Sequence, residues 1–104
     1  MSAHVITIFR NRLREEAVAD YGPVAAEMAA LAGAMPGFVD AKTFSHADGE
    51  RVTVVTFADR ASHDAWRDHP AHREAQRRGI EEFYETYSIQ VGNVVYSHDF
   101  ERGN

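Results

Sequence analysis

The segment from His4 to Arg14 alternates as a β-strand does, but it carries apolar side chains on both faces. Val5, Phe9 and Leu13 lie on one face, and Ile6 and Ile8 lie on the other. Apolar surface is stabilised by its removal from water, so both faces of this strand need cover. The fold must therefore supply a layer on each side of the sheet.

Two further extended segments are expected at Phe38 to His46 and at Arg51 to Asp59. They flank Ala47-Asp48-Gly49-Glu50, whose Asp-Gly pair predicts a hairpin turn. Within the second segment, Val52-Thr53-Val54-Val55-Thr56-Phe57 is β-branched almost throughout. A run of this kind predicts a central strand that is covered on both sides.

Helical spacing of apolar residues predicts helices between these strands. The first runs from Glu15 to Met35, with an inward stripe at Val18, Tyr21, Val24, Met28, Leu31 and Met35. Pro36-Gly37 ends it. A short helix is expected from Ala61 to Asp68, and another from Pro70 to about Tyr84, because proline is tolerated at the first helical position.

A last strand is expected from Tyr87 to Phe100, with Gly92 as a candidate bulge. The resulting order predicts an α+β fold of the ferredoxin-like βαββαβ type, a four-stranded antiparallel sheet with its helices on one face. We predict one domain over residues 1–100 and a loose tail at 101–104. Because the helices cover only one face, we predict a homodimer that packs sheet against sheet.

Composition excludes several classes of protein. The 104 residues include no cysteine, which rules out disulfides, thiolate metal sites and a cysteine nucleophile. A net charge of −5 argues against a nucleic-acid partner. No stretch reaches the roughly 20 apolar residues of a membrane span, and no secretory signal is visible, so we expect a cytoplasmic protein with no membrane partner.

The densest polar cluster runs from Trp66 to Arg78 and holds the only tryptophan, two histidines and four arginines. In one interpretation it is a pocket mouth, with His69 or His72 as acid, base or axial ligand. Arg67, Arg73 or Arg77 then holds an anionic substrate. In the other it is a solvated helix face, with Trp66 filling the core. A proline separates the two histidines and no further residue has ligand spacing, so we predict no metal site.

Asn11 shares a strand face with Phe9 and Leu13. If that face packs on the helices, the amide is buried and needs a partner or a ligand, since an unsatisfied polar group costs about 1–3 kcal/mol. If the strand frays there, the amide meets water. The remaining histidines are expected at the surface: His4, His46, His63 and His98.

Several motifs together give the chain a resemblance to the antibiotic biosynthesis monooxygenase family. They are Phe9-Arg10-Asn11-Arg12-Leu13, Met35-Pro36-Gly37-Phe38, Trp66-Arg67-x-His69-Pro70-x-His72-Arg73, Ala75-Gln76-x-x-Gly79 and Phe83-Tyr84-x-x-Tyr87. The resemblance covers Val5 to Phe100 and implies a dimeric α/β barrel of two ferredoxin-like subunits.

Two branches of the family suggest roles for particular residues. Haem-degrading members use an asparagine on the first strand, a tryptophan after the third and a histidine that ligates iron. Asn11 and Trp66 match the first two, whereas Gln76 stands at the ligand position and His72 lies one turn earlier. The cofactor-free branch, which oxidises anthrone-type phenols to quinones with O₂, has an asparagine and a tryptophan where this chain has Thr56 and Arg60.

The resemblance implies a monooxygenase that acts on a small flat aromatic or phenolic substrate with O₂, without metal or flavin. In this hypothesis His72 is the base, Asn11 a polar anchor and Trp66 a wall of a dry cavity. The expected substrate-binding residues are Arg67, His69, Gln76 and Phe83. The alternatives are haem binding or degradation, and a non-catalytic dimeric module that binds a small ligand.

Overall fold

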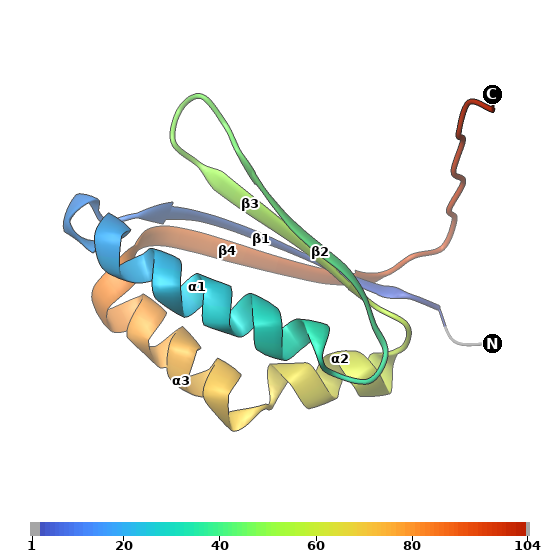
Figure 1. Cartoon of the computed structure of the whole chain (residues 1–104), viewed down its shortest axis with the longest axis horizontal. Helices are drawn as coiled ribbons and strands as arrows, with labels where there is room; N and C mark the ends of the chain where they lie inside the picture. The colour runs from blue at the N-terminus through green and yellow to red at the C-terminus, as the bar shows by residue number, and fades with distance from the viewer. Residues whose placement is uncertain (1–2, 104) are drawn as a thin grey trace.

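The computed structural model describes residues 3–103 and contains one four-stranded antiparallel sheet. Its strands are β1 Val5–Leu13, β2 Phe38–Ser45, β3 Arg51–Phe57 and β4 Tyr84–Asn93. They lie in the order β2-β3-β1-β4, so β3 is central, as the sequence predicted. All the helices cover one face of this sheet, which confirms the ferredoxin-like α+β architecture (Figure 1).

The helical elements follow the predicted order with small shifts at their ends. They are the 3-10 turn η1 Glu15–Ala17, α1 Val18–Gly33, α2 Arg60–Arg67, α3 Pro70–Arg78 and the π-helical turn η2 Gly79–Phe83. Side chains cap both short helices: Asp59 accepts from Ser62 N at 2.8 Å before α2, and His69 Nδ1 accepts from Ala71 N at 3.1 Å before α3. No helix within residues 3–103 combines the length and apolar character that a membrane crossing requires.

The core lies between the helices and the face of the sheet formed by odd-numbered residues of β1 and β3. Val5 and Phe57 are almost fully buried there. The predicted inward stripe of α1 is wrong at its first position, because Val18 is 58% exposed. The 3-10 turn that precedes α1 changes the phase of the helix, so that Ala17 packs inward in its place.

The last strand differs most from its prediction. β4 begins at Tyr84 and ends at Asn93, whereas the sequence favoured Tyr87 to Phe100. It begins earlier because η2 ends the helical segment at Phe83. The pairing of β1 with β4 is irregular between Arg12 and Leu13, near the start of β4. Gly92 pairs regularly with Ile6, so the expected bulge at Gly92 is wrong.

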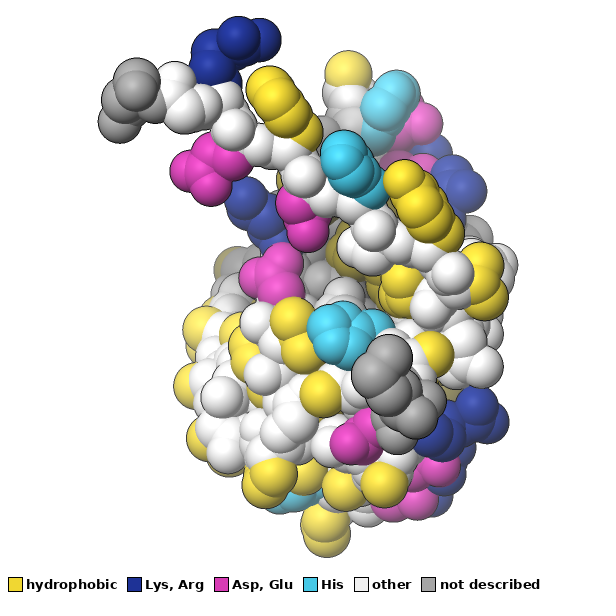
Figure 2. Space-filling view, turned by 90° about the vertical axis from the view of Figure 1, so that its right-hand side faces the viewer, with side chains coloured by type: hydrophobic (Ala, Val, Ile, Leu, Met, Phe, Trp, Pro, Cys, Tyr) yellow, Lys and Arg dark blue, Asp and Glu magenta, His cyan; other side chains and the backbone are white. Residues whose placement is uncertain are grey.

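Residues 94–103 form neither helix nor strand, and all their apolar side chains except Val94 are exposed. Figure 2 views the end of the molecule where the chain termini lie and shows this segment standing away from the body. Val95 is 95% exposed, and Tyr96 and Phe100 are also open to solvent. The predicted strand could not continue here because no neighbouring strand within residues 3–103 pairs with the segment.

The second face of the sheet carries no helix (Figure 1). Even-numbered residues point to it, and its apolar members are Ile6, Ile8, Phe44, Val52 and Val54. Phe44 is 54% exposed. The two-sided strand pattern in the sequence is therefore real, and the homodimer that it predicts would cover this face.

Candidate functional site

A cavity of about 640 Å³ lies between the sheet and the helices. The odd-numbered residues of β3 line its floor, from Arg51 to Phe57, and β1 adds Thr7 and Phe9. The opposite wall comes from α1, α2 and α3. A hollow of this size, with a mainly apolar lining and a few polar groups, is typical of a small-molecule site.

His72 and Trp66 form one wall of this cavity. Their rings are stacked, with centroids 4.3 Å apart and an interplanar angle of 12°. His72 Nδ1 lies 3.1 Å from the Trp66 carbonyl oxygen, and because a carbonyl only accepts, Nδ1 carries the proton. Burial lowers the pKa of His72 below its ordinary value, so the ring is neutral near pH 7. Nε2 is then an unprotonated nitrogen, as a general base requires.

His63 is a cavity residue that the sequence analysis wrongly placed at the surface. It is 8% exposed, and its Nδ1 lies 2.8 Å from an Asp64 carboxylate oxygen. This hydrogen bond is the main reason that the pKa of Asp64 is lowered. The signal was helical spacing: His63 is three residues before Trp66, so both lie on the inward face of α2.

The structure buries Asn11, which decides between the two interpretations of that residue. It is 2% exposed, and neither its amide oxygen nor its amide nitrogen has a hydrogen-bond partner among residues 3–103. Across the sheet it faces Arg51 on β3 and Tyr87 on β4, and both of these residues line the cavity. Asn11 itself lies behind that lining.

Arg51 is a second cavity residue that sequence reasoning missed. Its Nε is buried without a partner, and its guanidinium lies 4.9 Å from the centroid of the Tyr21 ring. The odd-numbered positions of β3 would have pointed to it, since Arg51, Thr53, Val55 and Phe57 share one face.

Aromatic side chains close the same end of the cavity. The Tyr84 hydroxyl donates to the Tyr21 hydroxyl at 3.4 Å, and the Phe9 ring meets Tyr84 edge to face at 5.4 Å. Burial raises the pKa of Tyr84 far above its ordinary value, so the phenol stays protonated. Gly79 makes this packing possible, because a Cβ there would overlap the Tyr84 ring.

The other residues expected at the site divide into two groups. Phe83, Gln76 and Arg67 line the cavity; Phe83 is buried, and the other two are largely exposed. Arg67 also pairs with Asp68 at 3.0 Å. His69 does not line the cavity, because its ring is used to cap α3 and lies 5.7 Å from the Trp66 ring.

The residues do not fit a haem iron at the position that the family resemblance assigns. Gln76 offers only a neutral amide, which is a poor iron ligand, and it is exposed. His72 has one free nitrogen, but its ring lies flat on Trp66. Among residues 3–103, no three His, Asp or Glu side chains gather as a metal site would require. The residues at this position therefore do not fit haem.

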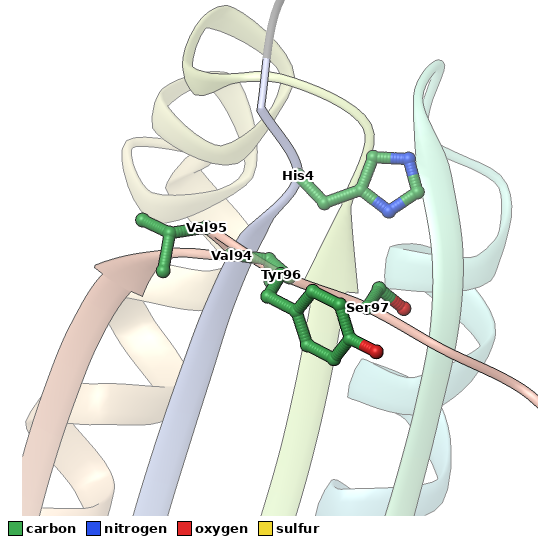
Figure 3. Close-up of a pocket in the computed structure, with 5 residues that line it drawn as sticks. All are labelled: His4, Val94, Val95, Tyr96 and Ser97. Atoms are coloured by element: carbon green, nitrogen blue, oxygen red, sulfur yellow. The ribbon is translucent and has the colours of Figure 1, made fainter.

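A smaller hollow of about 280 Å³ lies where the chain leaves β4. Figure 3 shows His4 on one side of it and the side chains of Tyr96 and Ser97 on the other, with Val95 pointing away. It is shallow and open, and its wall is formed by the exposed segment after Asn93. It offers no buried polar group comparable with Asn11.

Comparison with solved structures shows the same fold in several proteins. Rv0793 from Mycobacterium tuberculosis has a TM-score of 0.83 and 19% identity, covering 93% of this chain and all of its own (100%). SnoaB, a cofactor-independent oxygenase from Streptomyces nogalater, has a TM-score of 0.77 and 17% identity over 92% of this chain and 97% of its own. A conserved protein from Methanosarcina mazei Go1 has a TM-score of 0.78 and 12% identity, with 88% and 92% covered.

Comparison with curated protein sequences gave no match. The sequence model of one family, described as antibiotic biosynthesis monooxygenase, matches residues 4–78. That match spans β1 to the end of α3 and includes Asn11, Trp66 and His72. The chain therefore belongs to the antibiotic biosynthesis monooxygenase family.

Proposed function

We propose that this protein is a cytoplasmic, homodimeric monooxygenase that oxidises a flat phenolic substrate with O₂, without metal or flavin. The observation that carries the proposal is His72, a neutral base with Nδ1 fixed to the Trp66 carbonyl, in the wall of a cavity of about 640 Å³. Family membership and the fold shared with SnoaB, a cofactor-independent oxygenase, support the same reaction class.

The residues supply what such a reaction needs from a protein. His72 Nε2 takes a proton from the substrate, and the electron-rich anion that results can react with O₂ directly. For an anthrone-type substrate, a ring CH₂ group and O₂ give a ring carbonyl and water, so one O₂ is consumed for each carbonyl formed. Trp66, Phe9 and Phe83 supply flat apolar walls that exclude water. Arg67 and Gln76 stand at the exposed side of the cavity, where substrate enters.

Oxygen uptake with a panel of anthrone-type phenols and quinols tests the proposal. The wild-type protein should consume O₂, and His72→Gln should reduce the rate by about 10²-fold or more, the usual contribution of a general base. Arg77→Gln is a matched control, because Arg77 pairs with Glu74 at 2.6 Å away from the cavity. The proposal fails if no phenol or quinol gives uptake above that of His72→Gln.

The homodimer is tested separately. Ile6, Ile8 and Val54 lie on the sheet face that no helix covers, and a second copy of the same face is the economical cover. Light scattering at micromolar concentration should give twice the 11.7 kDa mass of the chain. A mass of one chain would refute the dimer.

A further inference from the structure

Three cationic side chains line the cavity between the sheet and the helices, and none of its described lining residues is an aspartate or glutamate. The three are Arg51, Arg60 and Arg67. Lys42 pairs with Val54, so its side chain points to the open face of the sheet, over the Phe44 ring. This is a local reversal of the chain's charge, which is −5 overall. A hollow that is lined by one sign of charge and has low-dielectric walls attracts ligands of the opposite sign.

Arg51 differs from the other two cations. Arg60 and Arg67 are exposed and pair with Asp64, at 3.5 Å and 3.3 Å. Arg51 is half-buried and makes no ion pair or hydrogen bond within residues 3–103; it lies only against the Tyr21 ring. A buried charge that lacks a counter-charge is costly, so an anion bound there would be strongly favoured.

Asn11 reinforces the same position. It is directly opposite Arg51 in the β1–β3 register, so the two side chains are neighbours on one face of the sheet. Asn11 is almost fully buried, and neither polar atom of its amide has a partner within residues 3–103. Two adjacent polar side chains with unused hydrogen-bonding capacity therefore lie at one end of a mainly apolar cavity, Arg51 in its lining and Asn11 directly behind it.

We propose that Arg51 binds a carboxylate on an elongated aromatic substrate, at the end of the cavity that Asn11 backs. The inference rests on the proposed function, because it takes the cavity as the substrate site. Arg51 presents a planar fork that matches a carboxylate with two parallel hydrogen bonds. His72 and Trp66 lie at the other end, where Trp66 packs with Phe57. Arg51 and Phe57 are the two ends of β3, about 20 Å apart along the strand, so the substrate has several fused or linked rings.

Paired fluorescent probes test this assignment without turnover. Anthracene-2-carboxylate and anthracene-2-methanol share a flat ring system and differ in charge, and fluorescence anisotropy reports the binding of each. The wild-type protein should bind the carboxylate about tenfold or more tightly than the alcohol. Arg51→Gln should bind both probes with the affinity of the alcohol. Arg51→Lys keeps the charge but not the fork, so it should keep a weaker preference. Arg77→Gln removes a surface arginine and should behave as wild type.

Three results would overturn the assignment. The first is a wild type that shows no preference for the carboxylate. The second is an Arg51→Gln variant that keeps the preference, and the third is an Arg51→Gln variant that loses affinity equally for both probes. The last result would mean that Arg51 shapes the cavity through its contact with Tyr21. Circular dichroism checks that each variant folds, and the wild-type preference is measured even if Arg51→Gln does not fold. A carboxylate preference without oxygen uptake would refute the monooxygenase proposal and leave the role of Arg51 standing.

Discussion

Replacing Asn11 with leucine should stabilise the protein and impair its function. Leucine has the same number and arrangement of side-chain heavy atoms as asparagine but no polar group. Asn11 is 2% exposed, and both polar atoms of its amide lack partners. A buried polar group without a partner costs about 1–3 kcal/mol, so Asn11→Leu should raise the free energy of unfolding by about 2 kcal/mol. Residues kept at such a cost are typical of binding sites.

Urea unfolding at fixed protein concentration measures the change, because a dimer's stability depends on concentration. Thermal unfolding should show a rise in Tm of roughly 4–8 °C per kcal/mol for a domain of this size. Asn93→Leu is the control: Asn93 is exposed at the end of β4, so its replacement should change stability by less than about 0.5 kcal/mol. If Asn11→Leu lowered stability by 1 kcal/mol or more, the amide would be well satisfied in solution and the reasoning would be refuted.

Further predictions concern His72, Gly79 and the binding of haemin. Because burial lowers the pKa of His72, kcat/KM should keep more than half of its plateau at pH 6.5 and fall only in more acidic solution; a midpoint above 6.5 would contradict this. The same shift makes the contribution of His72 to stability decrease as the pH falls below 6.5, since the unfolded chain then binds the proton more readily. Gly79→Ala should destabilise the fold by about 1–3 kcal/mol, because its Cβ would overlap the Tyr84 ring, whereas Gly33→Ala meets open space and should not; urea unfolding compares them. Titration with haemin should give no saturable Soret shift at one haem per subunit, since Gln76 is a poor iron ligand; a shift that His72→Ala abolished would reverse that conclusion.

Most of the fold could be predicted from local patterns. Alternation located β1, β2 and β3, the Asp-Gly pair located the hairpin, and Pro70 marked the start of α3. The errors lie where tertiary packing overrides local preference. β4 begins at Tyr84 because a π-helical turn ends the helix early, and nothing in the apolar spacing distinguishes that turn from an α-helix. The residues after Asn93 have strand-like composition, but no described strand pairs with them.

The site was predictable only in part, because proximity across the sheet cannot be read from spacing along the chain. Trp66 and His72 stood out as unusual residues in one polar cluster, and the structure brings them into contact. His63 and Arg51 lie in segments of ordinary composition, and their burial depends on the strand register and on the helix that covers them. Asn11 could be assigned only as buried or solvated until the sheet placed it between β3 and β4.

The proposed selectivity for an anionic substrate rests on the arrangement of charges around the cavity of an otherwise acidic protein. Arg60 and Arg67 at the exposed side of the cavity pair with Asp64, and Arg67 also pairs with Asp68. The hydrogen bonds of Asp68 to Arg67 and Arg73 lower its pKa to about 2. The charges of Arg60 and Arg67 are therefore nearly balanced, and the charge without an ion pair lies inside the cavity at Arg51. Tyr84 beside it stays protonated because it is buried, so no phenolate of the protein competes for the guanidinium. Selectivity for an acid should therefore change little when Arg60 or Arg67 is replaced and be lost when Arg51 is.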